Sequence, residues 1–255
     1  MWKNGVVELE LLTIALIFVT GLVASFIGTN VGGGGMIVIP ALIALGFPPK
    51  AAIATMRVGS CGLLTGGTAK FHEKQKIDYN IGIPSALLAL AGAYFGATTL
   101  VELSNETVGR LVGFLMLVVL AFVIYNRDIG IEKTPRKGIF GRFLGYASFL
   151  LIGFYGGIFG GGTGIFAAYV LIFFFGQTFL EAAGTWKVPA IAIAAASLAI
   201  FTVADLVDWI AGATLLVSML LGSYLGAAYA IEKGNRWVRA LFILFVLAAA
   251  LRLLF

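Results

Sequence analysis

The feature that most constrains this chain is its succession of long apolar runs separated by short polar breaks. Hydrophobic residues make up 60% of the 255 residues and charged residues only 11%, against about 25% charged residues in an ordinary soluble domain. One soluble core of this length could not remove so much apolar surface from water. The composition therefore excludes a soluble globular protein, a disordered chain and a nucleic-acid-binding domain, and it predicts a polytopic membrane protein.

The apolar runs predict an all-α fold. Eight of the ten runs approach or exceed the ~17 residues that can cross a bilayer. The other two are too short to cross comfortably, and each follows a glycine cluster, so we expect broken or re-entrant half-helices there. The runs cover residues 9–27, 36–46, 50–70, 79–100, 107–125, 142–158, 164–176, 179–204, 209–231 and 237–254.

An internal repeat divides the chain. The tetrapeptide at 55–58 (TMRV) reappears at 185–188 (TWKV), a shift of 185 − 55 = 130 residues. At the same shift, the motif at 92–97 (GAYFGA) matches 222–227 (GSYLGA), and the glycine clusters align at a shift of 128. One two-residue insertion reconciles the two shifts. The chain therefore reads as two homologous halves, each with five hydrophobic segments.

These halves define the expected organisation: an N-terminal repeat over 1–126, a cytoplasmic linker over 127–141 and a C-terminal repeat over 142–255. The three parts are expected to form one integrated transmembrane domain.

The distribution of basic residues predicts how the halves lie in a cell membrane. The linker at 126–142 and the loops at 70–78 and 232–239 hold 11 basic residues, whereas four fall in loops on the opposite side. By the positive-inside rule, these three loops are cytoplasmic. Matching segments of the two halves then run in opposite directions. The sequence thus predicts an inverted repeat with both termini outside the cytoplasm.

Two cations stand apart from all other charges. Arg57 and Lys187 are repeat mates inside apolar runs, and all 12 acidic residues lie at or near segment ends. A charge within the bilayer costs at least ~2.5–3.5 kcal/mol on insertion scales. An anionic substrate is the simplest compensation. The alternative is that both side chains reach the headgroups, since each lies roughly 10 Å deep at 1.5 Å per residue.

The glycine clusters are the second signal for a binding site. The first reads GTNVGGGG over 28–35, and the second reads GGIFGGGTG over 156–164. Such runs do not propagate a helix, but they let backbone N–H groups converge where the next half-helix begins. The alternative is that the glycines only allow close helix packing. The candidate substrate-binding residues are Arg57, Lys187, Thr29, Asn30, Gly32, Gly33, Gly34, Gly35, Gly160, Gly161, Gly162 and Thr163.

Other polar residues have simpler expected roles. Asp78, Asp208 and Glu181 stand at helix starts and are expected to be caps, the last within a Thr178–Glu181 capping box. The small-xxx-small spacing of 92–97 and 222–227 is typical of helix packing. With one histidine and one cysteine, the chain offers no disulfide and no Cys/His metal pattern.

These features resemble the sulfite exporter TauE/SafE family over nearly the whole chain, from about residue 12 to 254. The resemblance rests on the paired glycine breaks, on a Thr-x-[Arg/Lys] motif and on Gly-[Ala/Ser]-Tyr-x-Gly-Ala in each half. The second motif adds Thr55 and Thr185 to the candidate site. The resemblance implies a secondary transporter of sulfite, an organosulfonate or a related sulfur or organic anion.

The expected function is therefore secondary transport of a small oxyanion by alternating access between the two repeats. The alternative is an anion channel that uses the same residues. No enzymatic activity, catalytic residue, metal or cofactor is expected. The expected partners are a small inorganic or organic anion and membrane lipid but no nucleic acid, with homodimerisation left open.

Overall fold

The computed structural model describes residues 2–3, 6–7, 11–125, 138–234 and 237. Apart from one pair of two-residue strands, the regular structure in this part of the chain is helical, and short loops join the helices. The strands β1 (Trp2–Lys3) and β2 (Val6–Val7) pair antiparallel. They were not expected, although the Asn4-Gly5 sequence between them is the pair that most favours a hairpin turn. The helices are α1 (Leu11–Val31), α2 (Gly34–Ala44), α3 (Pro49–Glu73), α4 (Tyr79–Glu102), α5 (Asn105–Tyr125), α6 (Ile139–Ile158), α7 (Thr163–Phe175), α8 (Phe179–Thr185), α9 (Lys187–Val203) and α10 (Trp209–Lys233).

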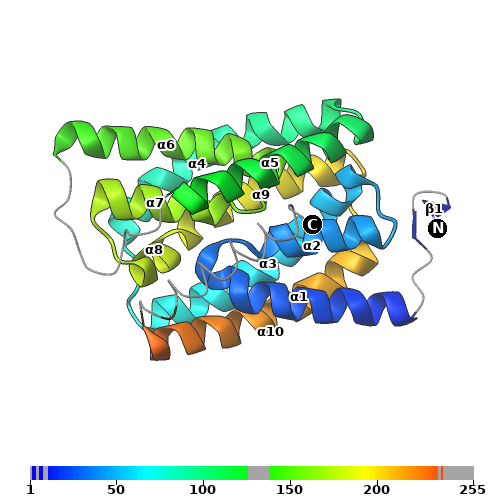
Figure 1. Ribbon diagram of the computed structural model, residues 1–255, viewed down its shortest axis with the longest axis horizontal. Helices are drawn as coiled ribbons and strands as arrows, with labels where there is room; N and C mark the ends of the chain where they lie inside the picture. Colours follow the sequence, from blue (N-terminus) through cyan, green and yellow to red (C-terminus); the bar gives the residue numbers. More distant parts are fainter. Residues whose placement is uncertain (1, 4–5, 8–10, 126–137, 235–236, 238–255) are drawn as a thin grey trace.

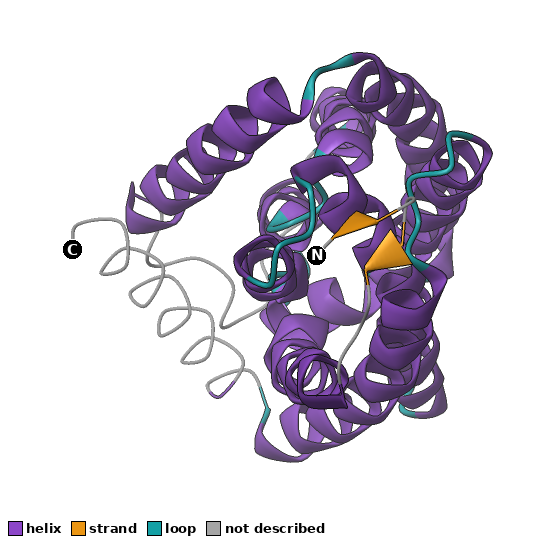
Figure 2. Ribbon diagram, turned by 90° about the vertical axis from the view of Figure 1, so that its right-hand side faces the viewer, coloured by secondary structure: helices purple, strands orange, loops and turns teal. Residues whose placement is uncertain are grey.

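The helices lie side by side along the long axis of the molecule (Figure 1), and many of them are seen end-on in Figure 2. Each predicted apolar run within the described residues forms a helix. The last run, at 237–254, lies outside them except for Trp237. Five described segments are long and apolar enough to cross a membrane: Leu11–Asn30, Tyr79–Glu102, Ile139–Ile158, Phe179–Val203 and Trp209–Lys233. The protein is thus a multi-pass membrane protein by composition and length.

The two short runs form short helices. α2 has 11 residues and α7 has 13, and each begins within a glycine cluster, α2 at Gly34 and α7 at Thr163. At 1.5 Å per residue, neither is long enough to cross the roughly 30 Å hydrocarbon core.

The predicted helix over 179–204 is divided at one residue. Trp186 separates α8 from α9, yet the hydrogen bonds run through it. Its backbone N–H donates to the carbonyl of Ala182 at 2.9 Å, and its carbonyl accepts from Ala190 at 3.0 Å. The segment therefore continues as one rod, because Trp186 keeps helical backbone angles.

The expected helix caps are confirmed. Thr178 and Glu181 form the reciprocal bonds of a capping box at the start of α8. The Asp78 side chain accepts from two backbone N–H groups at the start of α4, and the Asp208 side chain accepts from Ala211 at the start of α10. These carboxylates satisfy N–H groups that a helix start leaves without partners.

The first helix of each half packs on the fourth helix of the other half. α6 contacts α4, and α1 contacts α10. A Cβ on Gly96 would lie 2.1 Å from the Phe154 carbonyl oxygen, and a Cβ on Gly226 would lie 2.1 Å from that of Phe26. The small residues therefore let the paired backbones touch, as the spacing predicts.

The third helix of each half also meets the fourth helix of the other, through reciprocal contacts. The Asp208 backbone N–H donates to Thr55 Oγ1 at 3.0 Å, and the Asp78 backbone N–H donates to Thr185 Oγ1 at 3.1 Å. Each bond is the repeat mate of the other. Thr55 and Thr185 are fully buried, so they anchor the loops that begin α10 and α4.

Substitution of the contact glycines should cost stability. Because an added methyl group at position 96 or 226 meets a backbone carbonyl, Gly96→Ala and Gly226→Ala are each expected to destabilise by about 1–3 kcal/mol. The matched control is Gly113→Ala in α5, where an added Cβ meets nothing within 4 Å, and helix propensity makes the change neutral or favourable. Thermal unfolding in detergent measures all three. Equal midpoints for Gly96→Ala and Gly113→Ala would contradict this packing.

Candidate functional site

The two halves meet around a cavity of about 60 Å³. Two stretches that line it are repeat mates at the shift of 130 residues, one from α3 and one from Trp186 and α9. Both glycine breaks complete the wall, and none of the described residues that line it is acidic. The lining residues are Met56, Arg57, Ser60, Leu63 and Leu64 with their mates Trp186, Lys187, Ala190, Ile193 and Ala194, and Gly28, Gly32, Gly34, Gly35, Gly160 and Thr163.

The cavity gathers half of the residues that the sequence singled out. Of the fourteen candidates, Gly32, Gly34, Gly35, Arg57, Gly160, Thr163 and Lys187 line it. The others lie beside the breaks or bind neighbouring segments, namely Thr29, Asn30, Gly33, Thr55, Gly161, Gly162 and Thr185. Met56, Ser60 and Trp186 were not singled out as binding residues. Their helical spacing from the two cations, together with the repeat register, could have indicated them.

Arg57 reaches across to the second glycine break. The residue is 6% exposed, and its Nη2 donates to the carbonyls of Gly156 and Gly157 at the end of α6. Its Nε has no hydrogen-bond partner. The guanidinium therefore neutralises the negative end of a broken helix and keeps a free donor inside the protein.

Lys187 binds the end of a helix at the first glycine break in the same way. The residue is 1% exposed, and its Nζ donates to the Thr29 carbonyl at 2.6 Å and to Thr29 Oγ1 at 2.9 Å, near the end of α1. The ring of Phe71 lies 5.6 Å from the ammonium. Thus each cation binds the broken helix of the opposite half. Both charged groups lie inside the protein and do not reach its surface.

Carboxylates do not neutralise these cations. Among the described residues the ion pairs are Lys70–Glu73, Lys74–Glu73 and Arg110–Glu106, all at helix ends. The same part of the chain holds no group of three His, Cys, Asp or Glu side chains that could bind a metal. Among the described residues, the two cations are therefore stabilised by carbonyl groups, by the Thr29 hydroxyl and by the Phe71 ring, without a carboxylate.

Free backbone donors add to this charge. Within the described chain the N–H groups of Gly160, Gly161 and Gly162 have no hydrogen-bond partner, whereas all three carbonyls have one. The Gly160 carbonyl accepts from Thr163, and Tyr155 donates its hydroxyl to the Gly161 carbonyl at 2.6 Å. Across a trans peptide, the C=O of one residue and the N–H of the next point in opposite directions, so the bound carbonyls of Gly160 and Gly161 fix the orientation of the Gly161 and Gly162 N–H groups. Free N–H groups at a helix start suit an anion.

Close packing accounts for some of the glycines. A Cβ on Gly32, whose φ is +70°, would lie 2.2 Å from the Gly164 Cα, so the two breaks cross backbone on backbone. The packing alternative therefore holds at this crossing. It holds less well at Gly160, where a Cβ would meet the Arg57 guanidinium.

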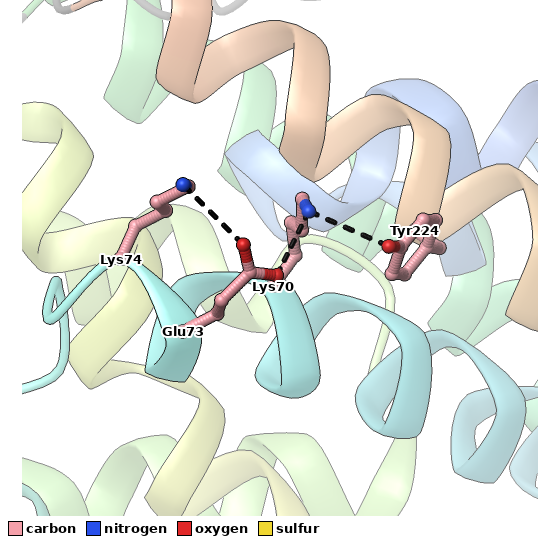
Figure 3. Close-up of polar contacts among 4 residues, drawn as sticks. All are labelled: Lys70, Glu73, Lys74 and Tyr224. Carbon is pink, nitrogen blue, oxygen red and sulfur yellow. Dashed lines mark hydrogen bonds and ion pairs between the residues drawn. The ribbon is translucent and has the colours of Figure 1, made fainter.

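A separate charged cluster stands at the end of α3, where Lys70, Glu73 and Lys74 meet Tyr224 of α10 (Figure 3). Hydrogen bonds from Lys70 and then Lys74 hold the pKa of the Glu73 carboxyl below its ordinary value. Hydrogen bonds with Glu73 and then Tyr224 raise the pKa of Lys70. These basic side chains are bound to Glu73 near the surface, within the segment 70–78 that the sequence predicts to be cytoplasmic.

Alanine substitution at Gly160 should cost stability in two ways, by strain of the left-handed backbone and by displacement of Arg57. Comparison with Gly46, where only the backbone strain applies, separates the two effects. Gly160→Ala places a Cβ 2.4 Å from Arg57 Nη1 at a φ of +78°, whereas Gly46→Ala has a φ of +94° with nothing within 4 Å. Gly46→Ala should cost about 1–2 kcal/mol for the left-handed backbone alone. Gly160→Ala should cost at least about 1 kcal/mol more, because Arg57 loses its carbonyl partners. Thermal unfolding gives the difference, and equal losses would mean that the guanidinium is not held there.

Comparison with known proteins gives this architecture a family context. The family model described as sulfite exporter TauE/SafE matches residues 17–253. A probable membrane transporter protein, ORF9, from Sinorhizobium sp is 29% identical over 94% of this chain and 92% of its own length. One from Haemophilus influenzae is 27% identical over 91% and 90%. The probable membrane transporter YfcA of Escherichia coli K12 is 23% identical over 99% and 93%. No solved structure matches the chain.

Proposed function

Because the chain belongs to the sulfite exporter TauE/SafE family of membrane transporters, we propose that it carries a small oxyanion, sulfite or a related sulfur anion, as a secondary transporter. The observation that carries the proposal is the cavity wall, whose described lining holds two buried cations and no acidic side chain. It lies beside a glycine break with free backbone N–H groups at Gly160, Gly161 and Gly162. An anion with several oxygens can accept from both kinds of donor at once.

The size of the cavity favours a compact substrate. A volume of about 60 Å³ has room for a few water-sized groups. That suits an inorganic oxyanion such as sulfite better than an organosulfonate with a carbon chain. The apolar lining residues, such as Leu63 and Ile193, exclude water around the anion and so strengthen its attraction to the cations.

The reciprocal contacts support an inverted repeat that works by alternating access. One pair of bonds between the halves has its positions exchanged, because Asp208 donates to Thr55 and Asp78 donates to Thr185. Arg57 and Lys187 each tie one half to the broken helix of the other. A bound anion offers Arg57 and Lys187 alternative hydrogen-bond acceptors. It therefore lowers the free-energy cost of breaking the bond between one cation and its helix end while the other bond stays in place.

Flux measurements in liposomes test this function. Arg57→Ala and Lys187→Ala should each lower kcat/KM for sulfite about 10–100-fold, as expected for losing a hydrogen bond to a charged group worth about 1.5–3 kcal/mol. Arg57→Lys should recover part of the loss by restoring charge without the fork geometry. The matched control is Arg110→Ala, because Arg110 pairs with Glu106 at the surface. Unchanged sulfite flux in the double alanine variant would contradict the proposal, and single-channel currents would indicate a channel.

Thiol labelling tests the proposed orientation in the cell membrane. In a Cys61→Ala background, an impermeant reagent on intact cells should label Arg110→Cys and Val203→Cys, which are exposed at the predicted outer side. Lys74→Cys and Lys233→Cys should react only after the membrane is opened. Labelling of the two lysine positions in intact cells would contradict the inverted arrangement with both termini outside.

A further inference from the structure

Trp186 lies where the two halves of the cavity come together. It precedes Lys187 directly, lines the cavity and is 8% exposed. Its repeat mate is Met56, which precedes Arg57 and lines the opposite wall. The pair is unequal in chemistry, because an indole carries an N–H donor whereas a thioether has none.

The indole N–H lies at the crossing of the glycine breaks and has no protein partner. A Cβ on Gly164 would lie 2.6 Å from Trp186 Nε1 and 2.5 Å from the Gly32 Cα. Thus the nitrogen edge of the indole rests on the point where the two breaks touch. Within the described residues no hydrogen bond joins Nε1 to another group.

Arg57 Nε is a buried donor without a hydrogen-bond partner among the described residues, and it belongs to a residue that lines the same cavity. Such donors are uncommon, since buried polar groups are normally hydrogen-bonded. An indole N–H can only donate, so the partner that Trp186 can take in this cavity is likewise an acceptor. Arg57 Nε from one half and Trp186 Nε1 from the other half are therefore both donors that need a hydrogen-bond acceptor.

From this arrangement we infer that Trp186 donates its indole N–H to the bound anion and helps to determine which anion is accepted. The inference rests on the proposed function, because it assigns a contact within that site. Arg57 supplies charge from one half, and Trp186 supplies a neutral, directed donor from the other. A fixed donor favours an anion that presents an unprotonated oxygen there, and it disfavours a protonated oxygen, whose own hydrogen would face the N–H.

The test compares binding of sodium sulfite to the purified protein in detergent by calorimetry. Trp186→Phe keeps an aromatic ring and removes the N–H, and it should raise the Kd at least about tenfold, as expected for a hydrogen bond to a charged group. Trp209→Phe is the matched control, because Trp209 is 55% exposed on α10. It should leave the Kd unchanged. Both variants should unfold at the parent temperature.

A second measurement uses the parent protein and does not depend on how Trp186→Phe folds. With ¹⁵N-labelled tryptophan, saturating sulfite should shift the indole ¹⁵N–¹H resonance of Trp186, identified by its absence in Trp186→Phe or in Trp186→Tyr. The resonance of Trp209 should stay in place.

The outcomes separate this contact from the proposed function. If the parent binds sulfite while Trp186→Phe binds equally well and the Trp186 resonance does not move, the indole contact is wrong and the oxyanion site stands. If the parent binds neither sulfite nor sulfate nor phosphate, the proposed function fails and the contact fails with it. A weakened Kd together with a shifted Trp186 resonance supports both.

Discussion

The structure depends on how two positive charges are held inside an apolar protein. A buried cation without partners would cost several kcal/mol, and here the partners are the carbonyl ends of two broken helices. Arg57 binds the end of α6, and Lys187 binds the end of α1. These carbonyls are free because α6 and α1 stop at glycine clusters. The helix breaks and the buried cations therefore compensate each other.

This compensation requires the two halves to be interleaved. A cation of one half reaches the opposite helix end only because the first helix of each half packs on the fourth helix of the other. Glycine makes that packing possible, since α4 touches α6 and α1 touches α10 at backbone distance. The cavity is then formed by residues that are far apart in sequence but equivalent in the repeat, such as Arg57 and Lys187.

The two halves of the repeat also carry side chains of different chemistry at equivalent positions. Arg57 has Lys187 as its mate, and Met56 has Trp186. Arg offers a rigid fork of donors, whereas Lys offers a compact charge that bonds to a carbonyl and a hydroxyl of one residue, Thr29. The second break has Tyr155 to hold its loop, but the equivalent residue of the first half is Ile27, which has no hydroxyl. Equivalent positions of the sequence repeat therefore supply different hydrogen-bond donors to the two halves.

Much of this protein follows from the sequence alone, because the responsible signals are local. Apolar run length gave the helices, and polar residues at helix starts gave the caps at Asp78, Asp208 and Thr178. The register of 130 residues paired Arg57 with Lys187 before any contact was known. Among the described elements, the strand pair near the N-terminus and the division of one helix at Trp186 were missed. Both are features of one or two residues, below the resolution of a periodic pattern.

The tertiary structure decided which groups meet. Nothing in the sequence indicated that Arg57 binds Gly156 and Gly157, that Lys187 binds Thr29, or that Thr55 and Thr185 anchor the opposite half. Spacing and composition report the surroundings of a residue along its own helix. Which residues of the two halves meet depends on the distance between the packed backbones and on the space left for each side chain. Both are determined only when the helices pack.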